Sequence, residues 1–380
     1  METDRQKLGY LDGLRGIAAF YVMVGHSRSL LWEGYSSGFL QHPNAYNILE
    51  KIFMYSLSTF RFGVEVVFFF FVLSGFVIHL NFSQRFRYSN SIGSDYWKYI
   101  WKRIKRIYPP FVFALMLTFV LDTCGNRLGF QNDIAVRELQ KVATITHYLD
   151  LRTLVFNVFF LYYTYAPLYG SNGPTWSLKF EWWFYMFYPL LMMISRTKIL
   201  LATGCVFILF LLTFFPQLWP EQLSREIFTL MLSWWWGVLL AEVYSRRINI
   251  NLKYVSLLMS LFFILPIFSK LGNTIYFNTV SLAFAGLIAF CLSVKETSVG
   301  IKIISKLKLL GQFSFTLYII HYPVFIFIRG LWQSSHGGLL PMHFGLVFLS
   351  IVSVTLLAYL LHFITEVPFV SSKRKTIIIT

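Results

Sequence analysis

Charged residues are scarce in this sequence. Asp, Glu, Lys and Arg together make up 13% of its 380 residues, hydrophobic residues make up 56%, and aromatic residues make up 19%. An average soluble domain carries about 25% charged residues, and a mean hydropathy of +0.60 is far too apolar for one soluble core. The composition therefore excludes an ordinary soluble protein and indicates a chain that crosses a membrane several times.

Cysteine is scarce as well. Cys124, Cys205 and Cys291 lie far apart, so neither a disulfide framework nor a zinc site built on paired cysteines is expected. The phosphate loop GxxxxGK[ST] and the zinc helix HExxH do not occur, and ATP hydrolysis and a structural metal have no support in the sequence. We expect a protein without a metal.

Apolar segments of about 20 residues predict an all-α, polytopic integral membrane bundle of about ten transmembrane helices. The expected segments are 11–31, 60–81, 107–123, 175–195, 198–215, 226–243, 253–269, 274–293, 309–329 and 343–366. The connections 32–59 and 124–174 are long, and residues 154–165 within the second predict a re-entrant or interfacial helix. Neither a repeat nor a change of composition divides the chain, so one membrane-embedded domain over 1–380 is expected.

The basic residues predict the orientation of the bundle. With the N-terminus in the cytoplasm, the cytoplasmic segments carry about twice as many Lys and Arg residues as the opposite side, as the positive-inside rule requires. Both termini are therefore expected in the cytoplasm, and both long loops on the extracytoplasmic side. The net charge of +16 then reflects topology and anion binding, and nucleic acid is not an expected partner. No small-residue cleavage site follows the first apolar segment, which favours a retained helix over a signal peptide.

The first apolar segment keeps three ionisable residues, Asp12, Arg15 and His26. Eleven residues are about three turns at ~3.6 residues per turn, so Arg15 and His26 share a helix face and lie about 16 Å apart along it. The same helix rise puts Glu65 and Glu181 near the height of His26, in the outer half of the membrane. Intramembrane ionisable residues usually face each other or a wet cavity. Because a histidine beside carboxylates can act as a general base, we predict catalytic roles for His26, Glu181 and Glu65.

Each of these residues also has a structural interpretation. Glu65 follows Arg61 by four residues and could form an ion pair with it. Glu181 could anchor two helices through hydrogen bonds, and His26 could bond a neighbouring helix without any chemistry. A stripe with four-residue spacing on the helix of Glu181 points to a shared cavity. The residues expected to line this cavity are Asp12, Ser74, Trp176, Ser177, Tyr185 and His321.

A basic cluster, DYWKYIWKRIKRIYPP at 95–110, precedes the third apolar segment. From composition alone it is a positive-inside anchor with interfacial aromatic residues. Alternatively it binds a phosphorylated ligand, because arginine forks and lysine ammonium groups match phosphate oxygens. Arg15, expected at the same cytoplasmic level, favours the second interpretation.

Five motifs occur in order along the chain: LDGLRGIAAFYVMVGH, FGVEVVFFFFVLSGFVI, KRIKRIYPP, TWSLKFEWWFY and FSFTLYIIHYPV. In this order they resemble the acyltransferase-3 family of integral membrane acyltransferases, from Leu11 to TEVPF at 365–369. The chain resembles the stand-alone form of the family, without an SGNH domain. It departs from the common pattern at Glu65, where many relatives have Asp, and at Thr175, where Ser is frequent.

The family has two signatures that this sequence matches. An arginine and a histidine separated by ten residues correspond to Arg15 and His26, and Arg-x-x-Arg corresponds to Arg103 and Arg106. The resemblance implies that these three arginines bind acyl-CoA and that His26 takes the proton of an acceptor hydroxyl. Glu181 or Glu65 would then orient the imidazole.

The resemblance also implies an activity and a location. Members are multi-pass enzymes of the bacterial inner membrane that move an acyl group, usually acetyl, from cytoplasmic acyl-CoA to a hydroxyl. The expected acceptor is an extracytoplasmic polysaccharide or lipid-linked glycan, such as lipopolysaccharide O-antigen, and membrane lipids are the other partners. No side chain stands out as a covalent nucleophile, so direct transfer is expected, with an acyl-histidine intermediate as the alternative. Ser177, Trp176 and Tyr185 are candidates for the oxyanion donor.

Three other functions are weighed against this one. A small molecule such as a macrolide is the alternative acceptor. A proton-coupled glycolipid carrier would also bury His and Glu, but carriers commonly have two related halves with broken helices, and this sequence has no such symmetry. A membrane scaffold would have no reason to keep charges at one depth.

Overall fold

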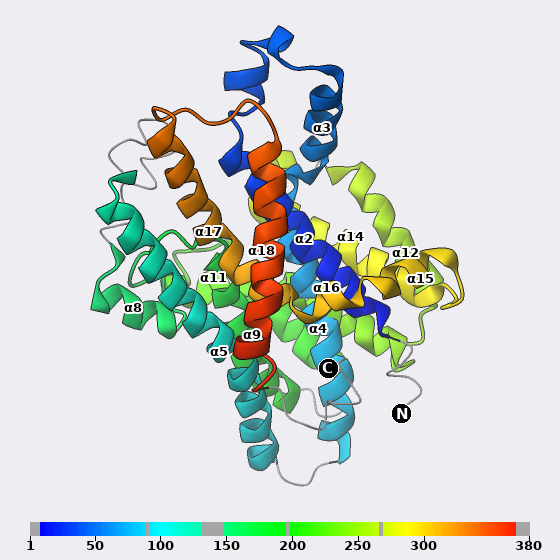
Figure 1. The fold of residues 1–380 in the computed structure, drawn as a ribbon. Coiled ribbons are helices and arrows are strands. Elements are labelled where there is room, and N and C mark those ends of the chain that lie inside the picture. The colour runs from blue at the N-terminus through cyan, green and yellow to red at the C-terminus, as the bar shows by residue number, and fades with distance from the viewer. Residues whose placement is uncertain (1–7, 89–91, 131–147, 195–197, 266–268, 370–380) are drawn as a thin grey trace. The chain divides into compact units, whose positions relative to one another are not determined.

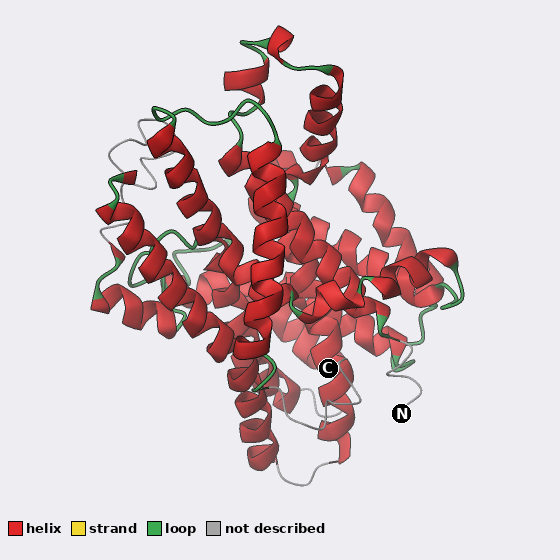
Figure 2. Ribbon diagram, in the orientation of Figure 1, coloured by secondary structure: helices red, strands yellow, loops and turns green. Residues whose placement is uncertain are grey.

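The computed structural model describes residues 8–88, 92–130, 148–194, 198–265 and 269–369. These residues form helices and loops, with no β-strand among them (Figure 2). The all-α fold predicted from the sequence is confirmed. The ends of the chain, 1–7 and 370–380, lie outside the described residues, and their cytoplasmic placement stays a prediction.

A helix lies at each of the ten predicted segments. These helices are α2 (Tyr10–Leu31), α4 (Gly63–Tyr88), α5 (Ile92–Arg127), α9 (Trp176–Ile194), α10 (Ile199–Leu212), α11 (Gln222–Tyr244), α12 (Leu252–Ser256) with the 3-10 helix η6 (Leu257–Phe263), α14 (Asn273–Ser293), α17 (Ser314–Ser335) and α18 (Gly345–Thr365). Six of the described helices, α4, α5, α11, α14, α17 and α18, are long and apolar enough to cross a membrane. The bundle is thus of the polytopic membrane type, while the count of ten spans stays a prediction.

Short helices fill the connections. They are the π-helix η1 (Tyr35–Phe39), the 3-10 helices η2 (Pro43–Ala45), η3 (Thr59–Arg61), η5 (Gly173–Thr175) and η7 (Ser269–Leu271), and the α-helices α3 (Ile48–Ser58), α8 (Leu151–Val158), α15 (Val299–Lys306) and α16 (Lys308–Gln312).

The helix predicted over 154–165 is displaced, because α8 covers only Leu151–Val158. It begins early since the Asp150 side chain accepts a hydrogen bond from the Thr153 amide and caps the helix. It ends early since Phe160 and Tyr163 adopt left-handed φ values of 57° and 63°, which an α-helix cannot contain. Local capping therefore outweighs the apolar pattern here.

The chain divides into two compact units. Unit 1 consists of Met1–Gly63, Lys105–Trp176 and Ser305–Thr380, and unit 2 consists of Val64–Ile104 and Ser177–Ile304. Both are discontinuous in sequence, so no shift of composition marks their limits. The single domain expected over 1–380 stays a prediction.

In unit 1, α2 packs against α16, α17 and α18 (Figure 1). Two glycines, one on α2 and one on α16, let these two helices approach each other closely. A Cβ on Gly16 would lie 2.6 Å from the Gly311 amide nitrogen, and one on Gly311 would lie 1.9 Å from the Asp12 carbonyl oxygen. Small residues at a helix crossing let two backbones touch, as is common in membrane bundles. The contact brings the end of α16 against the first turns of α2.

In unit 2, α4 and α11 cross in the same way. A Cβ on Gly237 would lie 1.9 Å from the Val72 carbonyl oxygen, and one on Gly75 would lie 2.2 Å from the Trp234 carbonyl oxygen. Here too the two helices meet backbone to backbone. The position of this crossing determines which side chains of α4 lie opposite which side chains of α11.

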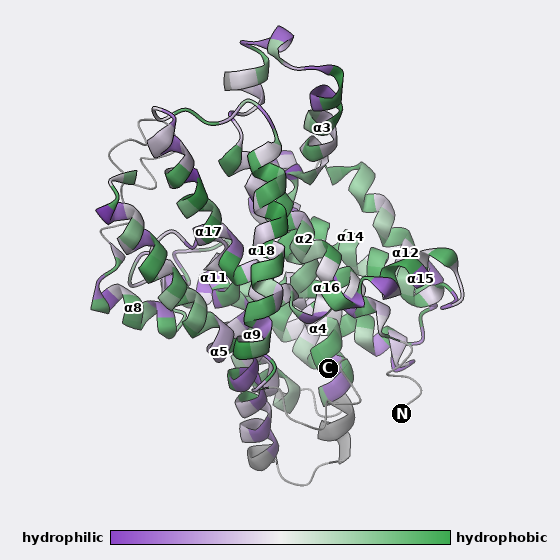
Figure 3. Cartoon of the chain, in the orientation of Figure 1, coloured by the Kyte–Doolittle hydropathy of each residue, from purple (hydrophilic) through white to green (hydrophobic). Residues whose placement is uncertain are grey.

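Helix α18 in unit 1 presents apolar side chains outward. Only 22% of its most apolar window is buried, and Figure 3 shows hydrophobic residues along its length. The large exposed side chains include Leu349, Val352, Leu356, Leu360, Phe363 and Ile364. A continuous apolar surface of this kind is stable when lipid covers it.

Candidate functional site

Arg15 joins α2 to the start of α17 in unit 1. Its Nη2 donates to the Gly311 carbonyl at 2.8 Å, and its Nε donates to Ser314 Oγ at 3.1 Å. Asp12 lies one turn earlier, with Oδ1 3.0 Å from Arg15 Nη2. The arginine side chain nevertheless keeps 25% of its surface exposed. Arg15 is thus held in place by its own unit, with a quarter of its side-chain surface exposed.

His26 lies eleven residues further along α2, half-buried. Its ring centroid is 5.3 Å from that of His321, with the planes inclined by 28°, and 5.0 Å from that of Tyr322, which stands edge-on at 88°. In the described part of the chain, neither ring nitrogen of His26 has a hydrogen-bond partner. Such an imidazole can accept the proton of a hydroxyl that reaches it.

His321 lies deeper, with no exposed surface. Its Nδ1 is 3.0 Å from the Leu317 carbonyl oxygen. Because a carbonyl can only accept, Nδ1 carries the hydrogen and the other nitrogen, Nε2, carries the lone pair. Nε2 is buried and has no partner among the described residues. Sequence reasoning assigned His321 to the cavity lining, and the structure brings it against His26.

The loop before α9 supplies a hydrogen bond that α17 lacks close to these histidines. Pro323 has no N–H, so the Ile319 carbonyl four residues earlier loses its usual helical partner. Asn172 Nδ2 donates to this carbonyl at 2.8 Å and to Thr118 Oγ1 at 3.3 Å. Asn172 is fully buried, and its amide replaces the backbone hydrogen bond that the proline removes.

Three further contacts hold the same loop. Both the backbone amide and the hydroxyl of Ser171 donate to Asp122, at 2.7 Å each. Gly170 has a φ of +57°, and a Cβ there would lie 2.4 Å from Asp122 Oδ2, so only glycine fits. The Tyr318 hydroxyl donates to the Pro174 carbonyl at 3.1 Å. The loop therefore supports α17 from a fixed position.

Removing the Asn172 amide should destabilise unit 1. Asn172→Ala leaves the Ile319 carbonyl buried without a partner, which costs about 1–3 kcal/mol of unfolding free energy. In a Pro323→Ala background the alanine supplies its own N–H, so the same substitution should cost clearly less. Unfolding of the four proteins in detergent measures this as a double-mutant cycle. Equal losses in both backgrounds would contradict the compensation.

Arg106 lies close enough to Glu366 for its charge to act on that carboxylate. Glu366 Oε1 accepts from Thr316 Oγ1 at 2.5 Å and lies 3.2 Å from His362 Nδ1. Burial raises the pKa of the Glu366 carboxyl, but His362, Thr316 and the charge of Arg106 together lower it more, so the pKa lies below its usual value. Arg106 therefore has a structural counter-charge within unit 1, which the sequence pattern did not reveal.

In unit 2, several predicted site residues form one cluster. The Tyr185 hydroxyl donates to Glu181 and lies 2.9 Å from Ser74 Oγ, which also accepts from Trp234 Nε1 at 3.3 Å. The guanidinium of Arg103 lies 5.7 Å from the Tyr185 ring centroid, in a cation–π contact. The predicted four-residue stripe thus does bring Glu181 and Tyr185 into contact.

The other predicted residues occupy separate positions. Glu65 Oε1 accepts from the Tyr276 hydroxyl at 2.9 Å, Ser177 is buried in the first turn of α9, and Trp176 is half-buried at the start of that helix. Glu65 and Glu181 belong to unit 2, whereas His26 belongs to unit 1. A contact between His26 and either carboxylate stays a prediction.

Unit 2 also holds a buried ionisable cluster that sequence reasoning missed. His79, 1% exposed, has Nδ1 2.7 Å from the Tyr188 hydroxyl and Nε2 paired with the Glu242 carboxylate. Arg247 donates to the same carboxylate from Nε at 3.0 Å. His79 lies inside the predicted segment 60–81, so the criterion that identified His26 would also have found it. The Glu242 carboxylate is paired with His79 and Arg247, and the hydrogen bonds of the cluster connect α4, α9 and α11.

One further sequence pattern, a GxSxG spacing, lacks the backbone geometry that its chemistry requires. Residues 34–38, GYSSG, have the spacing of the nucleophile elbow GxSxG, but they lie in and beside the π-helix η1 after α2, whereas an elbow needs a strand-to-helix turn. Among the described residues, no group of three or more His, Cys, Asp and Glu side chains could hold a metal ion.

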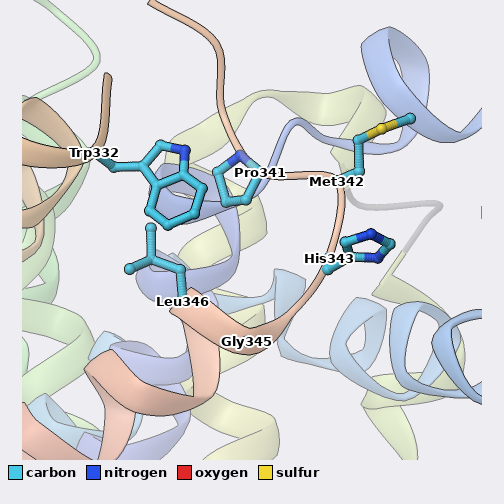
Figure 4. A pocket seen from close by; sticks show the side chains of 6 residues that line it. All are labelled: Trp332, Pro341, Met342, His343, Gly345 and Leu346. Carbon is cyan, nitrogen blue, oxygen red and sulfur yellow. The ribbon is translucent and has the colours of Figure 1, made fainter. Parts of the chain in front are cut away.

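A cavity of about 300 Å³ lies in unit 1 between the end of α17 and the start of α18. Trp32, just beyond α2, donates to the Met342 carbonyl at 3.1 Å, so the cavity adjoins the end of α2 that carries His26. No predicted site residue lines it, and its apolar lining suits an uncharged ligand surface rather than phosphates. The lining residues are Trp332, Pro341, Met342, His343, Gly345 and Leu346 (Figure 4).

Comparison with known proteins agrees with the motifs. The pattern of the acyltransferase-3 family, described as an acyltransferase domain, matches residues 8–363. The O-acetyltransferase OatA of Staphylococcus aureus (strain NCTC 8325 / PS 47) is 24% identical over 395 aligned residues, which cover 94% of this chain and 56% of OatA. The putative acetyltransferase ORF330 of Acidianus two-tailed virus is 24% identical over 300 residues, covering 75% of this chain and 80% of that protein. The chain thus spans little more than half the length of OatA. No solved structure gives a significant match.

Proposed function

The chain belongs to the acyltransferase-3 family of membrane acyltransferases, and from this we propose that it is an O-acetyltransferase of the bacterial inner membrane. The donor is acetyl-CoA, bound from the cytoplasm. The acceptor is a hydroxyl of a cell-envelope polysaccharide or lipid-linked glycan, such as lipopolysaccharide O-antigen. The name of OatA, an O-acetyltransferase, supports acetyl as the transferred group.

The observation that carries this proposal is the arrangement along α2. Arg15 and His26 both contact residues of α16 or α17, Arg15 near the start of α2 and His26 about 16 Å further along by the helix rise. One helix therefore carries a cation for an anionic donor at one level and, at another, an imidazole without a hydrogen-bond partner among the described residues. Long acyl-CoA molecules suit such a separation, because their phosphates and their thioester lie far apart.

In the proposed reaction His26 is the general base. The acceptor hydroxyl gives its proton to a ring nitrogen of His26 as its oxygen bonds the acyl carbon. The carbon–sulfur bond of the thioester then breaks, its electron pair goes to sulfur, and the His26 imidazolium returns the proton to the thiolate. No covalent acyl-enzyme is required. Ser177, Trp176 and Tyr185 are the proposed donors to the oxyanion.

The carboxylates of unit 2 have supporting roles in this proposal. Glu181 accepts a hydrogen bond from Tyr185, and Glu65 accepts one from Tyr276, so both are held in defined orientations. Either can stabilise the His26 imidazolium by its charge. The three arginines Arg15, Arg103 and Arg106 bind the phosphates of the donor.

The function is tested with purified protein in lipid nanodiscs and radiolabelled acetyl-CoA. The expected result is release of CoA together with label in a glycan acceptor. A panel of O-antigen polysaccharide, peptidoglycan fragments and a macrolide distinguishes an envelope glycan from a small-molecule acceptor. Absence of CoA binding and of acetyl transfer, with glycolipid movement across vesicles, would establish a carrier instead.

Arg15→Ala should impair use of the donor more than the chemical step. A hydrogen bond to a charged group contributes about 1.5–3 kcal/mol, so the KM for acetyl-CoA should rise about 10–100-fold. Arg15→Lys keeps the charge and should recover part of the loss. Steady-state kinetics with varied acetyl-CoA measures the effect.

Arg28→Ala is the matched control for Arg15, because Arg28 lies on the same helix but in its last turn. Its KM for acetyl-CoA should match that of the wild type. An unchanged KM in Arg15→Ala would leave Arg15 as a helix clamp only.

A further inference from the structure

His321 has a buried ring nitrogen, Nε2, without a hydrogen-bond partner in the part of the chain that the structure describes. The side chain has no exposed surface, and Nε2 has no hydrogen-bond partner among the described residues. Buried polar atoms in native proteins are nearly always hydrogen-bonded, and one that is not calls for an explanation. A ligand, a water or a second protonation state of a neighbour can supply the missing donor.

The other nitrogen of His321 determines what Nε2 can do. Nδ1 donates to the Leu317 carbonyl, so a neutral His321 has its lone pair on Nε2. Nε2 can accept a hydrogen bond, and it cannot donate one unless the ring is protonated. The backbone of α17 thus fixes the tautomer. In catalytic histidines, too, a hydrogen bond at one ring nitrogen determines which nitrogen carries the proton.

The neighbouring ring is the natural donor. His26 lies 5.3 Å from His321 between ring centroids, and its nitrogens have no partner in the described part of the chain. A neutral His26 has one N–H, and a protonated His26 has two. The orphan acceptor therefore stands next to the group that gains a hydrogen during the proposed reaction.

We propose that His321 is a positioning residue for acyl transfer, whose Nε2 accepts a hydrogen bond from His26 once His26 has taken the acceptor proton. The inference rests on the proposed function, in which His26 is the base. The proton stays on His26 and is returned from there to the departing thiolate, and His321 remains neutral throughout. Its contribution is to orient the His26 ring and to stabilise the imidazolium.

A neutral partner suits this location. A carboxylate without exposed surface would carry a charge that is costly to bury before His26 is protonated. The imidazole of His321 gives an acceptor of fixed direction without such a charge. Asn172 donates to the Ile319 carbonyl, two residues before His321. This hydrogen bond supports α17 where Pro323 interrupts it and keeps the acceptor in place.

Two substitutions separate the two nitrogens of His321. The amide of His321→Gln reaches the position of Nε2, whereas the amide of His321→Asn reaches the position of Nδ1. If His321 acts through Nε2, kcat should fall about 30-fold or more in His321→Asn and at least tenfold less in His321→Gln. The KM for acetyl-CoA and the melting temperature should change little in either variant. A purely structural role through Leu317 predicts the opposite order, with His321→Asn the more active protein.

A second readout does not depend on turnover. Nitrogen-15 spectra of histidine-labelled protein in lipid should contain one imidazole with Nδ1 protonated and Nε2 bare, and this signal should disappear in His321→Gln. A protonated Nε2 in the wild type would overturn the inference.

The activity data distinguish failure of this inference from failure of the proposed function. Equal kcat values in His321→Gln and His321→Asn, beside an active wild type and an inactive His26→Ala, would overturn the role of His321 alone. A wild type that binds acetyl-CoA without releasing CoA, or a fully active His26→Ala, would overturn the proposed function and this inference with it.

Discussion

Alanine in place of His26 is expected to reduce acetyl transfer by about 10²–10⁴-fold, the usual contribution of a positioned general base. The half-buried ring contacts His321 and Tyr322 and makes no hydrogen bond among the described residues. Its removal should therefore cost little stability beyond the lost packing, and binding of acetyl-CoA should persist. Transfer of radiolabelled acetyl and equilibrium binding of CoA, measured on the same preparation, separate the two effects.

His42→Ala is the control for His26. His42 is an exposed histidine in the loop that follows α2, so its loss should leave both transfer and binding at wild-type values. Normal product yield from a folded His26→Ala protein would rule out the proposed mechanism. Loss of CoA binding together with transfer would instead assign His26 to the donor site.

Gly237→Ala is expected to be the most destabilising single methyl addition in unit 2. The new Cβ would lie 1.9 Å from the Val72 carbonyl oxygen and 2.6 Å from the Phe76 amide nitrogen. Both are backbone atoms, so no side chain can rotate away and α4 must separate from α11. Overpacking of this kind costs about 3 kcal/mol of unfolding free energy, which chemical unfolding in detergent, followed by intrinsic tryptophan fluorescence, measures.

Gly204→Ala supplies the comparison for Gly237. Gly204 lies within α10, and a Cβ there would meet nothing within 4 Å. Alanine should leave the stability unchanged or raise it by up to about 1 kcal/mol, because it is a better helix former than glycine. If both variants unfold alike, the close approach of α4 and α11 does not hold in solution.

The sequence predicted much of the fold and part of the site. A lipid-embedded helix must be apolar over most of its length, so the apolar segments located the helices α2, α4, α5, α9, α10, α11, α12, α14, α17 and α18. The prediction failed at 154–165, where the Asp150 cap and the left-handed Phe160 decide the ends of α8. Neither feature alters hydropathy, so the apolar pattern could not predict these limits.

Partner residues were the harder prediction. The spacing of Glu181 and Tyr185 was enough to expect their contact, since both lie on one helix. The charge of Arg106 acts on Glu366, and His79 bonds Glu242; both pairs join distant parts of the chain. Each residue could be singled out from the sequence as ionisable in an apolar setting, but its partner could not.

By itself the sequence determined that this protein is a helical membrane protein of the acyltransferase-3 family, because hydropathy and ordered motifs are properties of the chain. It also determined that Arg15 and His26 share a face of α2, since helix geometry alone relates them. Only the tertiary structure decided that this face meets α17, that His321 lies beside His26, and that Asn172 replaces the hydrogen bond removed by Pro323. These contacts depend on how helices cross, and crossing is governed by shape, at glycines such as Gly16 and Gly311, which hydropathy does not encode.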